Sequence, residues 1–104
     1  MILVCGSANM DLVVRTARLP AAGETVMGST FTTFSGGKGA NQAVAAAKLG
    51  GRVEFLGKVG EDTFGETLME SLSDAGVGTS HCWTSLEPTG IAMIAVDDAG
   101  QNQI

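Results

Sequence analysis

Segments typical of strands and of helices alternate along this chain. The first residues, "MILVCGS", form a continuous apolar run that ends at a glycine, which predicts a strand buried on both faces of a parallel sheet. A helix is predicted over residues 39–49, a second strand over 52–60 and a second helix over 62–75. This order favours an α/β fold, a parallel sheet built from right-handed βαβ connections.

The predicted helices carry their own boundary signals. Gly50 and Gly76 follow them as left-handed stop residues, and Asp62 stands where a capping side chain belongs. Apolar side chains at helical spacing predict the faces that pack on the sheet: Ala43, Val44, Ala47, Phe64, Leu68, Leu72 and Ala75.

Residues 12–15 and 26–34 are predicted as exposed, antiparallel strands, because the first is β-branched and the second shows β-forming residues in partial alternation. A further strand is predicted over residues 91–96. A turn with Asp97, Asp98 and Gly100 follows, and Ile104 begins a returning strand. Residues between the second helix and residue 91 read as a polar loop. Because the chain stops within a hairpin, we expect an N-terminal fragment of a longer protein; the alternative is a frayed polar tail.

Composition excludes several classes of function. The 104 residues match one small domain, 44% apolar and 16% charged. A net charge of −5, six scattered basic residues and few aromatic rings argue against a nucleic-acid surface. Neither an apolar run of membrane-spanning length nor a signal peptide is present, so a cytoplasmic protein without membrane partners is expected.

The cysteines predict neither a disulfide nor a metal centre. Cys5 lies in the apolar first run and Cys82 in the predicted polar loop, without the paired spacing of a zinc site. His81 is adjacent to Cys82, but no further ligands cluster with them. Both cysteines are therefore expected as free thiols, with no metal ligand in the chain.

A glycine-rich segment, residues 35–41 ("SGGKGAN"), leads into the first predicted helix. A Walker A loop would need glycine at Thr32 and a hydroxyl residue at Gly39, and a dinucleotide fingerprint read from Gly37 would need a small residue at Gln42. Both phosphate-binding patterns fail. What remains is a helix start whose N–H groups suit oxygen-rich ligands, or a plain glycine-rich turn.

Polar side chains follow the first strand where α/β sheets place their ligands. Asn9 and Asp11 come at its carboxyl end, and the glycine-rich segment with Lys38 and Asn41 also follows a strand. Carboxylate and amide oxygens accept hydrogen bonds from hydroxyls, and N–H groups donate to them, so a neutral polyol fits. Each residue alone has a simpler role as a turn or cap former or a solvated charge.

The chain closely resembles the ribokinase-like, PfkB-type carbohydrate kinase family. The resemblance rests on "GSANMD", "LPAAGET", "SGGKGANQAVAAAKLG", "GKVGEDTFG" and "TGIAMIAVD", in this order and spacing. It covers all 104 residues, about the first third of a family member. The family's first signature is matched at Gly36, Gly37, Gly39, Asn41, Gly50 and Gly60.

The resemblance implies a ribokinase-like α/β fold with a small antiparallel β lid, formed near residues 12–34 and 91–104. It also implies a sugar site built from this chain. The residues that match the family's substrate-binding positions are Asn9, Met10, Asp11, Gly37, Lys38, Gly39, Ala40 and Asn41. No catalytic residue is implied here, because the family's base aspartate belongs to a later glycine-rich helix start.

The implied activity is an ATP-dependent transfer of the γ-phosphoryl group to the primary hydroxyl of D-ribose. The implied cofactors are ATP, Mg²⁺ and a monovalent cation (K⁺), bound mainly outside this chain, and the implied partner is a second copy paired through the lid. Kinases of fructose or of nucleosides in the same family are alternatives. A non-catalytic sugar-binding module and a nucleotide-binding regulatory domain are alternatives from other classes, the latter disfavoured by the failed glycine patterns.

Overall fold

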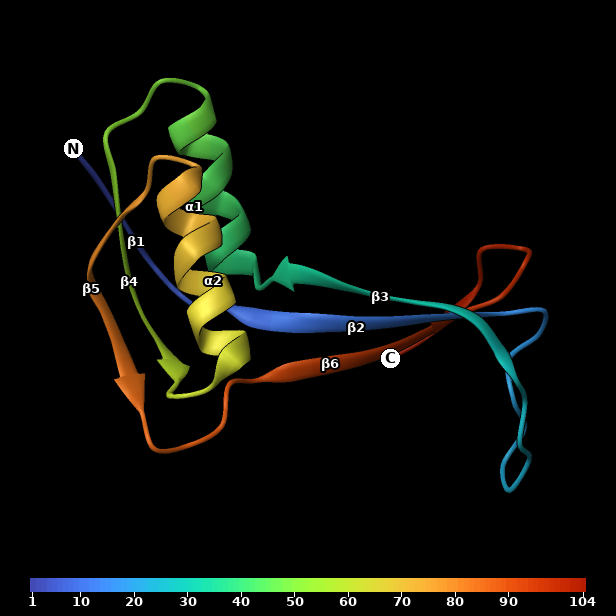
Figure 1. Ribbon diagram of the computed structural model, residues 1–104. Coiled ribbons are helices and arrows are strands. Elements are labelled where there is room, and N and C mark those ends of the chain that lie inside the picture. Colours follow the sequence, from blue (N-terminus) through green and yellow to red (C-terminus); the bar gives the residue numbers. More distant parts are fainter. The chain divides into compact units, whose positions relative to one another are not determined.

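The computed structural model describes residues 1–104, which form two compact units (Figure 1). Unit 1 comprises Met1–Met10 and Ser35–Gly90, and unit 2 comprises Asp11–Phe34 and Ile91–Ile104. The elements, in chain order, are β1 (Ile2–Cys5), β2 (Asn9–Thr16), β3 (Gly28–Gly36), α1 (Lys38–Lys48), β4 (Val53–Gly60), α2 (Thr63–Asp74), β5 (Gly78–Ser85), β6 (Ile91–Val96) and β7 (Asn102–Gln103).

Unit 1 is a parallel three-stranded sheet covered by two helices. Its strand order is β1-β4-β5, and both pairings are parallel. α1 packs against β1 and β4, α2 packs against β4 and β5, and the helices contact each other, so both cover one face (Figure 1). Phe55, Leu68 and Leu72 fill the core between these layers, and Ala43 lets α1 approach closely. The predicted α/β fold with a parallel sheet is confirmed.

Within residues 1–104 the first strand is not buried on both faces, contrary to the prediction. Leu3 is 55% exposed and Cys5 is exposed, although β1 pairs with β4 in the predicted parallel direction. The helices cover only one face of the sheet, and β1 is an edge strand in the order β1-β4-β5.

The predicted polar loop after α2 contains a strand instead. β5 runs in parallel with β4, and Cys82, placed by us in a loop, is buried on this strand between exposed neighbours His81 and Trp83. The sequence "GTSHCWTS" is mostly polar and therefore did not predict a strand. Only one face of β5 packs against the helices, so the side chains on its other face can be polar.

The helix boundaries agree closely with the sequence signals. α1 begins at Lys38, one residue before the predicted start, and Gly50 follows it with φ 94°. The Gly65 N–H donates to Asp62 Oδ1 over 2.8 Å at the start of α2, and Gly76 follows this helix with φ 88°. Glycine is the residue that adopts such positive φ values without strain.

Unit 2 contains the strands predicted over residues 12–15, 26–34 and 91–96. The second sheet has the order β3-β2-β6-β7, and β6 and β7 are antiparallel. Asp97 Oδ1 accepts hydrogen bonds from the N–H groups of Ala99 and Gln101, which closes the β6–β7 turn. The returning strand begins at Asn102 rather than at Ile104.

Candidate functional site

The glycine-rich segment packs with its backbone directly on the turn that follows β1. The Ala40 N–H donates to the Ser7 carbonyl over 3.0 Å. A Cβ atom added to Gly39 would lie 2.7 Å from Gly6 Cα, and one added to Gly37 would lie 2.5 Å from the Ser7 oxygen. Gly37 also has φ 101°. Only glycine allows this close approach, which fixes the glycine-rich segment on the turn that precedes Asn9.

The start of α1 is open to an oxygen-rich ligand. No side chain caps it and no acidic residue lies in its first turn. The Lys38 and Gly39 N–H groups lie in the first turn and have no acceptor within the helix, whereas the Asn41 N–H already donates to the Gly37 carbonyl. The side chains of Lys38 and Asn41 are exposed. This helix end therefore presents amide donors, an ammonium group and an amide with a net positive field.

The segment with Asn9, Met10 and Asp11 begins strand β2. Side chains alternate between the two faces of a strand, so those of Asn9 and Asp11 lie on one face of β2 and that of Met10 lies on the opposite face. Met10 is 1% exposed, and its N–H donates to the Gly90 carbonyl over 2.9 Å. Asn9 and Asp11 are half-buried. Their side-chain oxygens are suited to accepting hydrogen bonds from hydroxyl groups.

The predicted site residues thus differ in what they can offer a ligand. Asn9, Met10 and residues 37–41 belong to unit 1, and Asp11 is the first residue of unit 2. The side chain of Met10 is in the core, and Gly39 and Ala40 are buried against the turn after β1, so these three support the site through packing and backbone. Side-chain chemistry is left to Asn9, Asp11, Lys38 and Asn41.

A hydrogen-bond network at the start of α2 was not predicted from the sequence. Asp62 accepts hydrogen bonds from the Thr89 N–H, the Thr89 hydroxyl and the Gly65 N–H. These bonds, those from Thr89 foremost, hold the pKa of the Asp62 carboxyl below its ordinary value. The sequence identified Asp62 as a cap, but no local signal links it to a threonine 27 residues further on.

Residues 1–104 contain no group of three or more His, Cys, Asp or Glu side chains that could hold a metal ion. Both cysteines are free thiols, and burial raises the pKa of Cys82. Neither helix has the length and apolar composition that a membrane crossing requires.

Comparison with known proteins gives concordant matches. The family described as pfkB family carbohydrate kinase matches residues 1–104. Ribokinase from Bacillus subtilis is 54% identical over 80 residues, which cover 77% of this chain and 27% of that protein. The chain spans about a third or less of the length of its curated relatives.

Solved structures agree with the sequence matches. Arabidopsis thaliana ribokinase, complexed with ribose and ATP, is 43% identical and has a TM-score of 0.88 over 98% of this chain and 34% of its own. Ribokinase from Thermotoga maritima is 38% identical, with a TM-score of 0.92 over 99% of this chain and 34% of its own.

Proposed function

This chain belongs to the pfkB family of carbohydrate kinases, and on that premise we propose that it forms the sugar-binding and lid part of an ATP-dependent ribokinase. The enzyme transfers the γ-phosphoryl group of ATP to the primary hydroxyl of D-ribose. The observation that carries this proposal is the backbone packing of the glycine-rich segment on the turn after β1. It fixes the glycine-rich segment on the turn that leads into Asn9, some 30 residues earlier in the sequence, and both segments carry groups suited to a polyol.

The residues of this chain bind and orient the sugar. The Asp11 carboxylate and the Asn9 side chain accept hydrogen bonds from ring hydroxyls, and Asn41, Lys38 and the first amides of α1 donate to sugar oxygens. Fixing the hydroxyls at several points aligns the primary hydroxyl for in-line attack on the phosphoryl group. We assign no catalytic base and no metal ligand to residues 1–104.

ATP supplies the phosphoryl group, and Mg²⁺ with a monovalent cation such as K⁺ supplies charge neutralisation in reactions of this class. Neither glycine pattern of a phosphate-binding loop is present in the glycine-rich segment, so we assign that segment to the sugar and not to the nucleotide. A reaction that consumes ATP, in a protein with free thiols, suits the cytoplasm.

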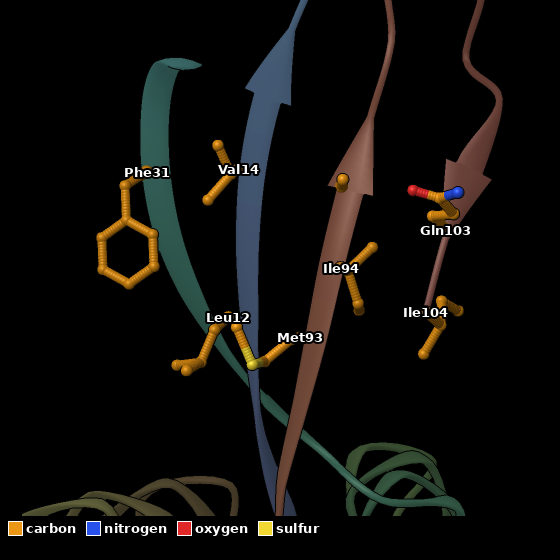
Figure 2. A pocket seen from close by; sticks show the side chains of 8 residues that line it. Leu12, Val14, Phe31, Met93, Ile94, Gln103 and Ile104 are labelled. Carbon is orange, nitrogen blue, oxygen red and sulfur yellow. The ribbon is translucent and has the colours of Figure 1, made fainter. Parts of the chain in front are cut away.

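Unit 2 acts as the lid of the proposed enzyme and as its dimer contact. Unit 2 has a groove of about 400 Å³ that is lined mainly by apolar side chains. Figure 2 shows among them Leu12 from β2, Phe31 from β3 and Met93 from β6. Phe31 is 63% exposed and Met93 is 71% exposed. A contiguous apolar patch of this kind on a small sheet favours contact with a second copy, which would cover it.

The test is a substrate comparison with the full-length protein. Phosphorylation of D-ribose, D-fructose and adenosine is measured with ATP, and the ratio of kcat/KM values identifies the substrate. We expect D-ribose to be preferred. If the protein phosphorylates fructose or adenosine but not ribose, the assignment of D-ribose as substrate is wrong, and the protein acts on another substrate of the family. Ribose binding without ATP turnover would make it a non-catalytic sugar-binding module.

A further inference from the structure

Thr89 makes three hydrogen bonds at the end of unit 1, two of them to Asp62. Its N–H donates to Asp62 Oδ2 over 2.8 Å, and its hydroxyl donates to Asp62 Oδ1 over 2.6 Å. The same hydroxyl accepts from the Gly60 N–H over 2.8 Å. Asp62 Oδ1 also accepts from the Gly65 N–H over 2.8 Å. Thr89 is 6% exposed, and the bond from the Gly60 N–H to its hydroxyl is buried, which shields that bond from competing water.

The surrounding backbone leaves no room for rearrangement. A Cβ atom added to Gly60 would collide with the Thr89 amide nitrogen, and one added to Gly65 would collide with the Gly60 carbonyl oxygen. The end of β4, the start of α2 and residue 89 therefore fit together in one arrangement.

Gly90, the residue after Thr89, contacts the proposed sugar-binding segment. Its carbonyl accepts the Met10 N–H over 2.9 Å, and its Cα is close enough to Asn9 that an added Cβ would lie 3.6 Å from Asn9 Cβ. Because Thr89 and Gly90 are consecutive, fixing Thr89 restricts where the Gly90 carbonyl can lie. Because the Met10 N–H is bonded to that carbonyl, the position of the carbonyl also determines where the start of β2 lies.

We propose that Asp62 and Thr89 are positioning residues, which hold the Asn9–Asp11 segment in its sugar-binding place through the Gly90 carbonyl. This inference rests on the proposed function. Neither residue needs to contact the sugar, the nucleotide or the reacting atoms.

The second carboxylate oxygen of Asp62 distinguishes this role from helix capping. A cap needs one oxygen, here Oδ1 bonded to the Gly65 N–H, and serine or threonine would supply it as well. Oδ2 is bonded to the Thr89 N–H instead. Aspartate is therefore required by the link to Thr89 and not by α2 alone.

The first test uses Thr89→Val and Thr89→Ser in the full-length protein. Valine keeps the branched shape and loses the hydroxyl, so we expect the KM for D-ribose to rise roughly tenfold while the KM for ATP changes less than about twofold. Serine keeps the hydroxyl and is expected to restore the ribose KM. If the ribose KM of Thr89→Val stays unchanged, or the ATP KM rises equally, the proposal is wrong.

Thr16→Val is the matched control. Thr16 is also a buried threonine, 5% exposed, and its hydroxyl donates to the Arg18 carbonyl over 2.7 Å. Loss of the Thr16 hydroxyl removes this part-buried hydrogen bond, which involves neither Gly90 nor Met10. An equal rise of the ribose KM in Thr16→Val would mean that general destabilisation, and not positioning, explains the Thr89 result.

The second test does not depend on catalysis. Hydrogen exchange at the Met10 amide should be faster in Thr89→Val than in wild type, and unchanged in Thr16→Val. Unchanged exchange in Thr89→Val overturns the positioning link even if the enzyme phosphorylates ribose. Faster exchange in a protein that phosphorylates no sugar supports the link and refutes the proposed function instead.

A third variant covers the case in which Thr89→Val does not fold. Asp62→Ser retains an oxygen for the α2 cap and lacks the second oxygen for the Thr89 N–H. We expect it to show the same faster Met10 exchange and higher ribose KM. Wild-type values for both quantities would overturn the proposal.

Discussion

Asp62 is the residue whose ionisation should matter most for folding. Its three hydrogen-bond donors stabilise the carboxylate, and its pKa in the folded state is therefore lowered from the ordinary value of 3.8. The depressed pKa stabilises the folded state above the unfolded-state value. That stability is lost as the pH falls through the folded-state pKa.

Asp62→Asn should remove this pH dependence. The amide nitrogen of asparagine cannot accept the Thr89 N–H, so the variant is less stable than wild type at pH 5 and above. The difference in thermal midpoint should shrink as the pH falls below 3.8 and through the lowered folded-state pKa of Asp62. Thermal unfolding is followed at several pH values, with the exposed Asp98→Asn as the control. A difference that stays constant over this range would contradict the assignment.

Asp11 supplies a separate prediction about the reaction. Asp11→Ala truncates the side chain to a methyl group and removes an acceptor for sugar hydroxyls, so the misplaced sugar should react with a kcat/KM at least about 100-fold lower. Asp98→Ala, in the β6–β7 turn, is the control and should retain activity. Steady-state kinetics with D-ribose provide the measurement. Near wild-type activity of Asp11→Ala would remove this residue from the site.

At the scale of elements, the junction between the turn after β1 and α1 depends on Gly39. Alanine in a helix is intrinsically more favourable than glycine by about 1 kcal/mol. At this position, however, the added Cβ would meet the Gly6 backbone at 2.7 Å, and neither backbone can rotate away. The two effects have opposite signs, and steric overlap is expected to be the larger.

Gly39→Ala should therefore lower the thermal midpoint and weaken ribose binding together. Differential scanning calorimetry gives the midpoint, and isothermal titration with D-ribose gives the affinity. Ala45→Gly, at an exposed position of α1, is the control for helix propensity alone and should leave the affinity unchanged. A higher midpoint for Gly39→Ala would show that α1 is not pressed against the turn.

At the scale of the whole molecule, the apolar groove of unit 2 predicts self-association. In Phe31→Thr/Met93→Thr both exposed apolar side chains are lost while β propensity is maintained. We expect wild type to sediment as a dimer and the double variant to dissociate at least about tenfold more readily, because less apolar area is buried on association. Analytical ultracentrifugation of the full-length protein provides the measurement.

The control for this experiment lies in unit 1. Leu86 is 95% exposed, and Leu86→Thr removes a comparable apolar side chain outside the groove. Its association should match that of wild type. If both variants associate as wild type does, unit 2 is not the contact.

Much of the fold was determined by local sequence signals. The helix ends are set by interactions within a few residues. The structure has Asp62 as the N-terminal cap of α2, and Gly50 and Gly76 follow the two helices with positive φ, as predicted. The apolar run at residues 1–7 identified β1 for the same reason, since a strand needs only a short stretch of suitable side chains. These features depend on neighbours in the chain, which the sequence displays.

The tertiary structure decided what depends on distant neighbours. β5 was not predicted because its outer residues are polar and only its pairing with β4 makes it a strand. Within residues 1–104, β1 is exposed on one side because both helices cover the same face of the sheet. The contact of Gly39 with Gly6 and the bond from Thr89 to Asp62 join residues about 30 positions apart. Backbone contacts and hydrogen bonds form between residues that are close in space. The sequence therefore identified the residues, and only the tertiary structure determined which of them contact each other.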